Sequence, residues 1–127
     1  MPELPEVETI VRGLRPRLAG RRVVRVCIAR PGIVKGSAAA LATRLEGATV
    51  REVRRFGKHI LLRMGRRGED RSYWLIVHLG MTGQLVVEPT RRAVRRHTHA
   101  WLELEGGQSL RYIDPRRFGR LDRKSVM

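Results

Sequence analysis

Two stretches of the sequence have the spacing of apolar residues that is typical of short helices. In the first, near the N-terminus, a proline suited to a first helical turn precedes apolar positions at helical spacing: Pro5, Val7, Val11 and Leu14. We expect this helix to end at Pro16, because proline lacks the backbone N–H that a helix interior needs. The second predicted helix is Ala38 to Leu45, with Ser37 as its N-cap and Gly47 as its stop.

Most of the remaining chain has the pattern of short β-strands. Residues Arg22 to Arg30 alternate, which places Val24, Val26 and Ile28 on one face. Six further segments are predicted strands, most of them separated by glycine or charged turns: Val50 to Phe56, His59 to Met64, Tyr73 to His78, Gln84 to Val87, Ala100 to Leu104 and Ser109 to Ile113. This spacing favours an antiparallel sandwich or barrel, with the two helices outside it or at an edge.

Length and composition fit one globular domain. The chain has 127 residues, of which 42% are hydrophobic and 31% charged. No apolar run approaches the roughly 18 residues of a membrane span, and the acidic, proline-broken start is unlike a secretory signal. We therefore expect a cytoplasmic protein that does not enter a membrane. The single cysteine, Cys27, can form no internal disulfide, and we expect it to be a buried strand residue.

The charge balance favours a polyanionic partner. The chain has 27 Lys and Arg against 12 Asp and Glu, a formal net charge of +15, and arginine supplies most of the positive charge. Its planar guanidinium matches phosphate oxygens and base edges better than an ammonium does. Nucleic acid is thus the favoured partner, while arginine-rich codon usage, a ribosomal protein and a simple basic module stay open. Glu88 to Arg96 is expected to form either a mobile basic loop that a DNA backbone orders or a plain solvated loop.

Metal binding is not expected from the histidines. His97 and His99 lie two residues apart and would share a face in an extended strand, where they could offer two ligands. A structural zinc site needs four ligands, and no others cluster with these two in the sequence. We therefore expect no metal site.

The Met1-Pro2 start permits one kind of nucleophilic chemistry. If Met1 is removed, Pro2 presents a secondary amine, and α-amino groups titrate at about pH 8, which leaves a useful neutral fraction near pH 7. Addition of this amine to a sugar aldehyde carbon gives an iminium, an electron sink for elimination. Glu3 and Glu6 offer carboxyls for proton transfer, although acids at a helix start also simply complement its dipole.

Four motifs stand in order along the chain. They are Pro2-Glu3-Leu4-Pro5-Glu6-Val7-Glu8-Thr9, Gly57-Lys58-His59-Ile60-Leu61-Leu62, His78-Leu79-Gly80-Met81-Thr82-Gly83 and Asp114-Pro115-Arg116-Arg117-Phe118-Gly119. Each alone is weak, but together they make the chain resemble the N-terminal catalytic domain of formamidopyrimidine-DNA glycosylases. The endonuclease VIII branch shares the general plan, whereas Leu4, Met81 and the Arg-Arg-Phe element are more similar to the formamidopyrimidine branch.

This resemblance implies a fold and an activity. The implied fold is mainly β with two helices, an antiparallel two-sheet β-sandwich flanked by α-helices. The implied activity is base-excision DNA repair by a bifunctional glycosylase and AP lyase. Such an enzyme removes oxidised purines, 8-oxoguanine and formamidopyrimidines, through a Schiff base on the N-terminal proline and then β,δ-elimination.

The resemblance also assigns catalytic roles to four residues. Pro2 would be the nucleophile at C1′ of the damaged nucleotide, and Glu3 the proton donor that helps open the sugar ring. Glu6 would assist proton handling or water placement. Lys58 would contact a phosphate beside the lesion and donate a proton in β-elimination; from sequence alone, a solvated lysine at a strand end is the alternative.

DNA-contacting roles follow from the need to extrude the damaged nucleotide and fill the vacated stack. The family motif gives the filling role to Met81, Arg116 and Phe118. Methionine adapts to an irregular gap, arginine can hydrogen-bond the orphaned partner base, and phenylalanine can wedge between bases. His78 and His97 would touch phosphates. Read without the motif, Met81 and Phe118 are core residues and the histidines are structural.

The resemblance covers nearly all of this chain but only about the first half of a typical family member. The helix–two-turn–helix and the zinc finger are absent from residues 1–127, so we expect no cofactor here; the full-length family carries one structural zinc. The expected partner is damaged double-stranded DNA, and the expected state is a monomer. Alone, the chain should bind DNA weakly with strong salt dependence and show little base excision. A non-catalytic basic DNA-binding module and a ribosome-associated protein are the rival functions.

Overall fold

The computed structural model describes residues 4–115 and 120–126. Its elements, in chain order, are α1 (Leu4–Leu18), β1 (Val23–Ile28), a 3₁₀ turn (Pro31–Ile33), α2 (Ala38–Leu45), β2 (Thr49–Phe56), β3 (His59–Gly65), β4 (Ser72–His78), β5 (Gln84–Pro89), β6 (Thr98–Leu104), β7 (Gln108–Ile113) and β8 (Arg120–Val126). The two predicted helices and all seven predicted strands are present.

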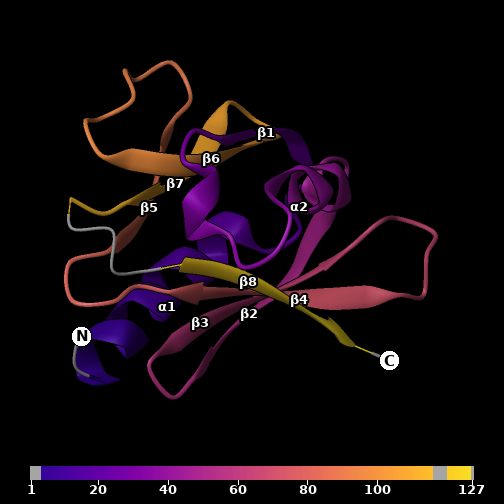
Figure 1. Cartoon of the computed structure of the whole chain (residues 1–127). Coiled ribbons are helices and arrows are strands. Elements are labelled where there is room, and N and C mark those ends of the chain that lie inside the picture. The colour runs from indigo at the N-terminus through magenta and orange to yellow at the C-terminus, as the bar shows by residue number, and fades with distance from the viewer. Residues whose placement is uncertain (1–3, 116–119, 127) are drawn as a thin grey trace.

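Two antiparallel sheets of four strands form the body of the domain (Figure 1). One sheet has the order β1-β6-β7-β5 and the other β2-β3-β4-β8. Helix α1 contacts β2 and β3 of the second sheet and β5 of the first, while α2 packs against β1. The expectation of a two-sheet sandwich flanked by helices is therefore confirmed.

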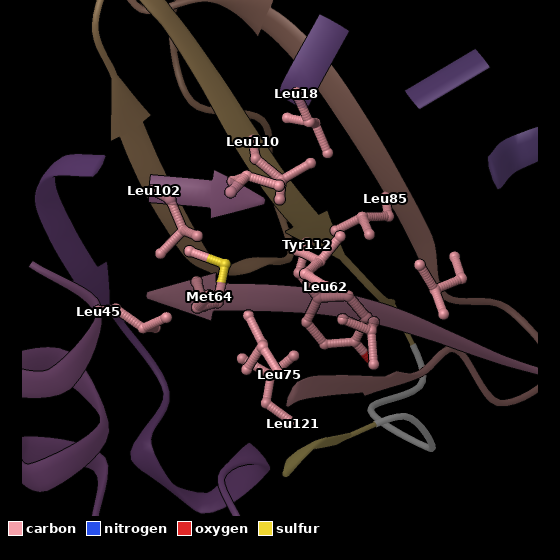
Figure 2. Close-up of a cluster of buried hydrophobic side chains, with 14 of the residues drawn as sticks. Leu18, Leu45, Leu62, Met64, Leu75, Leu85, Leu102, Leu110, Tyr112 and Leu121 are labelled. Carbon is pink, nitrogen blue, oxygen red and sulfur yellow. The ribbon is translucent and has the colours of Figure 1, made fainter. Parts of the chain in front are cut away.

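The hydrophobic core lies between the two sheets. Side chains from both sheets and from the helices point into the same space, as Figure 2 shows for Leu62 and Leu75 of one sheet and Leu102 and Leu110 of the other. Alternate positions along the strands are buried, because successive side chains point to opposite faces. Burial of this apolar surface supplies most of the stabilisation of the fold.

Helix α1 runs past the predicted end at Pro16. Proline in the last turn removes only one helical hydrogen bond. Beyond it the helical pattern continues, since the N–H of Ala19 donates to the carbonyl oxygen of Arg15 at 3.0 Å. Leu18 is fully buried in the core. Packing of that side chain offsets the cost of proline, so the prediction that Pro16 ends the helix is wrong.

Strand β1 contains a bulge that sequence alternation does not show. The pairing of β1 with β6 shifts between Val23 and Arg25. Val23 is therefore fully buried and Val24 exposed, while Val26 and Ile28 pack against the core. The prediction that Val24 shares a face with the latter two is wrong. Cys27 lies in this strand as expected but is only half-buried.

Helix α2 has the predicted ends. The hydroxyl of Ser37 accepts a hydrogen bond from the N–H of Ala40 at 3.1 Å, which satisfies one of the free donors of the first turn. At the other end Gly47 has φ +85°, a conformation that costs glycine little. Leu41 and Leu45 are its buried residues.

Strand β8 was not predicted. Its sequence, RLDRKSV, is mostly charged and has no apolar alternation strong enough to identify a strand. It pairs with the apolar strand β4 from Ser72↔Val126 to His78↔Arg120. Leu121 of this strand is buried and joins the core. Among the described residues, no helix is long and apolar enough to cross a membrane.

Candidate nucleic-acid interface

Three motif-bearing segments lie at the same end of the domain. In Figure 1 the start of α1, the turn between β2 and β3 and the turn between β4 and β5 are all on the left of the view. Strand pairing agrees, because His59, which follows the first turn, pairs with His78, which precedes the second. Residues that are 19 or more positions apart in the sequence are thereby brought together.

Lys58 lies at the tip of a tight hairpin. Phe56 and His59 pair across it, which leaves Gly57 and Lys58 as the two turn residues. Gly57 has φ +59°, as a type II′ turn requires at its first central position. Lys58 is half-buried, and Phe56 beside it is 74% exposed. The turn thus presents a cation and an aromatic ring at the tip of the sheet.

A charged contact ties this hairpin to helix α1. Nε of Arg55 donates to Oε2 of Glu8 at 2.8 Å, and Nη1 of Arg55 donates to the carbonyl oxygen of Gly57 at 3.0 Å. Arg12 donates to the other Glu8 oxygen at 3.2 Å. The hydrogen bond from Arg55 is the main cause that holds the pKa of Glu8 below its ordinary value of 4.5. The carboxylate therefore stays ionised at neutral pH.

His78 is the last residue of strand β4, and its ring lies against the ring of His59. The two ring centroids are 4.1 Å apart and the planes meet at 61°. His78 also pairs with Arg120 of β8. This part of the sheet accordingly presents imidazole groups beside the Lys58 hairpin.

Met81 stands at the tip of the turn between β4 and β5. Its side chain is 61% exposed, so the interpretation of Met81 as a core residue does not hold. The N–H of Gly83 donates to the carbonyl oxygen of Leu79 at 2.9 Å and closes the turn. A Cβ on Gly83 would overlap that same carbonyl, and Gly80 has φ +66°. The two glycines are what allow so tight a turn.

Asp114 joins the Met81 turn to the end of β7. Its carboxylate is fully buried and accepts hydrogen bonds from Oγ1 of Thr82 at 2.6 Å and from the hydroxyl of Tyr112 at 3.0 Å. Burial of the Tyr112 hydroxyl, together with its hydrogen bond to Asp114, raises the pKa of Tyr112 far above its ordinary value of 10.0. Tyr112 therefore stays protonated and remains a donor to Asp114.

His97 lies in a turn held by the same residue. It has φ +66°, the only positive φ of a non-glycine residue among those described, and its carbonyl oxygen accepts from the N–H of Asp114 at 3.0 Å. Its side chain is exposed, whereas His99 is buried with Nε2 against the carbonyl oxygen of Asp114. The two histidines therefore do not share a surface. Among the described residues, no group of three or more His, Cys, Asp or Glu could hold a metal ion.

The loop that precedes His97 is anchored, which corrects the expectation of a mobile loop in Glu88 to Arg96. Glu88, only 2% exposed, ion-pairs with the buried Arg111 at 2.9 Å and with Arg92 and Arg95 on the loop. The Arg111 guanidinium also donates to carbonyl oxygens of the loop, that of Arg92 at 2.7 Å and that of Thr90 at 3.2 Å. The arginines of the loop are exposed, and buried contacts from Glu88 and Arg111 hold its main chain and side chains in place.

Five of the nine predicted site residues lie within the part of the chain that the structure describes. Lys58, His78 and Met81 lie at one end of the domain, and His97 is linked to the Met81 turn through Asp114. Glu6 is exposed in the first turn of α1. The other four predicted residues lie outside the described residues: Pro2, Glu3, Arg116 and Phe118.

Sequence reasoning missed the residues that hold these groups in place. Glu8 and Arg55 are 47 positions apart, and Thr82 and Asp114 are 32 apart, so neither contact has a local signal. The sequence pattern assigns no role to Asp114 beyond its place in the fourth motif. The one available signal was that Glu8, Thr82 and Asp114 lie inside the same motifs as the predicted site residues.

Comparison with known proteins agrees with this arrangement. A family model described as the formamidopyrimidine-DNA glycosylase N-terminal domain matches residues 1–121. The chain is 42% identical over 122 residues to the formamidopyrimidine-DNA glycosylase of Acidiphilium cryptum, and 49% identical over 119 residues to that of Dechloromonas aromatica. These matches cover 96% and 94% of this chain but 42% of each relative. The chain therefore spans less than half the length of these relatives.

Solved structures show the same likeness in three dimensions. A crystal structure of Lactococcus lactis Fpg in complex with DNA that contains an abasic site matches with a TM-score of 0.90 at 30% identity, over 98% of this chain and 45% of that one. A complex of the same protein with DNA that contains FAPY-dG matches with a TM-score of 0.89 at 30% identity. Motifs, fold and relatives agree, and the chain belongs to the formamidopyrimidine-DNA glycosylase family, whose N-terminal domain it matches.

Proposed function

We propose that this domain carries the catalytic amine and the lesion-reading turns of a base-excision DNA glycosylase and AP lyase that acts on oxidised purines in double-stranded DNA. The observation that carries the proposal is the gathering of Lys58, His78 and the exposed Met81 at one end of the domain, beside the start of α1. Family membership supports it, as does the likeness to Lactococcus lactis Fpg structures that contain damaged DNA.

The proposed chemistry starts at the amine of Pro2, with Met1 removed. Its lone pair attacks C1′ of the damaged nucleotide, and the bond from C1′ to the base breaks with its electron pair on the base, which takes up a proton. A proton from Glu3 to the ring oxygen opens the sugar and leaves an iminium between Pro2 and C1′. Glu6 assists the proton traffic or places the water that later releases the amine.

Strand cleavage follows from the iminium. Loss of a C2′ proton sends electrons toward the cationic nitrogen and expels the 3′ phosphate, and a second elimination expels the 5′ phosphate. Lys58, at the hairpin tip, contacts a phosphate beside the lesion and donates a proton in the first elimination. A lysine suits this role because its compact ammonium can both pair with a phosphate and give up a proton.

Access to C1′ requires the nucleotide to leave the stack. Met81, Arg116 and Phe118 fill the vacated space, while His78 and His97 contact backbone phosphates. The 61% exposure of the Met81 side chain supports this role, because a large apolar side chain held at a turn tip is available to enter DNA. The net charge of +15 supplies sequence-independent attraction to the backbone, so binding should weaken steeply with salt.

The test is reductive trapping. The chain, with removal of Met1 verified by intact mass, is incubated with borohydride and duplex DNA that contains an abasic site. A covalent complex is expected, and Pro2→Gly should reduce or abolish it. Lys58→Ala should lower strand cleavage, whereas the matched change Lys35→Ala, at an exposed lysine near Asp122, should not.

Three outcomes decide against the proposal. Binding of abasic DNA with no covalent complex would indicate a non-catalytic basic module. A preference for folded RNA over damaged duplex would indicate a ribosome-associated protein. Equal trapping in wild type and in a form that retains Met1, where the Pro2 nitrogen is an amide, would mean that a different amine attacks the sugar.

A further inference from the structure

The buried residue Asp114 connects the Met81 turn and the His97 turn near the proposed site. Through its side chain it holds Thr82, the residue after Met81, and through its main chain it holds His97 and His99. Pro115 and then Arg116 follow it directly in the sequence. One residue therefore sets the spacing of the Met81 turn and the His97 turn.

We propose that Asp114 is a positioning residue, which acts through the Thr82 hydroxyl to hold Met81 at the place where it enters DNA. The proposal rests on the proposed function of the Met81 turn. Asp114 itself is fully buried, so it cannot contact DNA and acts only through the residues it holds.

The hydrogen bond from Thr82 to Asp114 is the contact that fixes the position of the Met81 turn. The turn from Leu79 to Gly83 has one internal main-chain hydrogen bond, from Gly83 to Leu79, and the 2.6 Å contact of Thr82 is the side-chain hydrogen bond that fixes it to the sheet beneath. The contact is short for an O–H···O hydrogen bond, and a buried acceptor that loses its donor costs about 1–3 kcal/mol. Insertion of a side chain into a base stack needs such fixation, because a turn that is free to move must lose its freedom on binding.

Tyr112 keeps the carboxylate aligned. Its hydroxyl donates to the second Asp114 oxygen, and its raised pKa keeps that donor present at any pH used for binding. The two carboxylate oxygens are thus divided between the sheet and the turn. Rotation of the carboxylate away from Thr82 would break the Tyr112 contact as well.

The test compares two threonines that flank strand β5. Thr82→Val removes the donor to Asp114 with little change of shape. Thr90→Val is the matched control, because its hydroxyl makes a 2.8 Å hydrogen bond with Ser109 at the opposite end of β5. Thr82→Ser keeps the donor and should restore wild-type behaviour. Two quantities are measured on the full chain: the exchange rate of the Gly83 amide, and the ratio of affinities for a duplex with a tetrahydrofuran abasic site and for the same duplex undamaged.

Thr82→Val is expected to raise the Gly83 exchange rate about tenfold and to lower the affinity ratio about tenfold, the size expected when a buried acceptor loses one hydrogen bond. Affinity for the undamaged duplex should not change, because it depends on the overall charge. A merely structural role would instead weaken both affinities together through loss of folded protein.

The outcomes separate this proposal from the proposed function. If wild type does not distinguish the two duplexes, the proposed function fails, and amide exchange alone then decides whether Asp114 positions the turn. An unchanged exchange rate or affinity ratio in Thr82→Val overturns the positioning role. An equal loss in Thr90→Val, or no rescue by Thr82→Ser, overturns it as well.

Discussion

Glu8 of helix α1 and Arg55 of strand β2 are joined by a 2.8 Å hydrogen-bonded ion pair, and the same guanidinium also binds the carbonyl oxygen of Gly57. The helix that follows Pro2 is in this way attached to the turn that presents Lys58. The proposed nucleophile and the proposed elimination residue come from segments more than 50 residues apart. Their relative placement depends on contacts of this kind.

Loss of the Arg55 contact should therefore impair chemistry more than folding. Arg55→Met removes both hydrogen bonds and keeps the apolar stem, and we expect the rate of borohydride trapping to fall about tenfold while the unfolding free energy changes by about 1 kcal/mol or less, as is usual for an exposed pair. Arg54→Met is the matched control, since Arg54 pairs with Glu52 and lies over Trp74 on the other face of the sheet. Equal trapping rates in the two variants would contradict the role given to Arg55.

The buried pair Arg111 and Glu88 should matter for stability. Arg111, 1% exposed, makes hydrogen bonds to Glu88 and to the carbonyl oxygens of the basic loop. Arg111→Met should cost about 3 kcal/mol in urea unfolding, because it leaves a buried carboxylate and several carbonyls without their main donor. Arg91→Met, an exposed change in the same loop, should stay within about 0.5 kcal/mol.

Combining the two changes tests the cause. In Arg111→Met with Glu88→Leu, the buried charge is removed together with its partner, so part of the loss should be recovered. A double variant as unstable as the sum of both single changes would show that the pair is not the source of the cost.

Two glycines should respond in opposite directions to alanine. A Cβ on Gly83 would overlap the Leu79 carbonyl oxygen, so Gly83→Ala should open the Met81 turn and destabilise the domain by about 1–3 kcal/mol. Gly13 lies within α1, with nothing within 4 Å of a Cβ, so Gly13→Ala should stabilise it by about 0.5–1 kcal/mol. Chemical denaturation of both variants checks the pair; stabilisation by Gly83→Ala would contradict the description of the turn.

Stability should fall at alkaline pH. Burial raises the pKa of Tyr73 from its ordinary value of 10.0 to about 12, so the folded state holds the phenolic proton more tightly than the unfolded state does. The resulting stabilisation is complete below about pH 10 and is lost as pH rises towards 12, by roughly 2 kcal/mol. Thermal unfolding measured from pH 8 to 11.5 should show this loss.

Tyr73→Phe should reduce the alkaline loss without abolishing it, because the pKa of Tyr112 is raised as well. The substitution should cost little at pH 7, since the Tyr73 hydroxyl has no hydrogen-bond partner among the described residues. An alkaline profile identical to that of wild type would assign the effect to another group.

Local signals in the sequence predicted much of the fold. Ser37 and Gly47 mark the ends of α2 because a cap and a positive φ are local requirements, and β-strand alternation identifies β2 to β7 for the same reason. Pro16 was misjudged because its cost is offset by the burial of Leu18. The bulge at Val24 depends on pairing with β6, which no local pattern records.

The residues of the candidate site could be predicted from the sequence, but the contacts that hold them in place could not. Lys58 and Met81 were recognised because the motifs that contain them resemble those of a family, and the glycines around them indicate turns. The contacts that fix them, Arg55 to Glu8 and Thr82 to Asp114, join residues that are distant in sequence. Such contacts follow from the strand order, which the sequence pattern left open between a sandwich and a barrel.

The pairing of β8 with β4 also affects how the domain behaves in concentrated solution. Strand β4, SYWLIVH, is apolar and would be a ready template for another chain if its N–H and C=O groups were left open. The seven residues of β8 pair with that edge of β4. Because β8 is rich in charged residues, it is a poor partner for a strand of a second copy of the chain. The segment with the weakest strand pattern thus covers an edge that would otherwise be open to pairing with another chain.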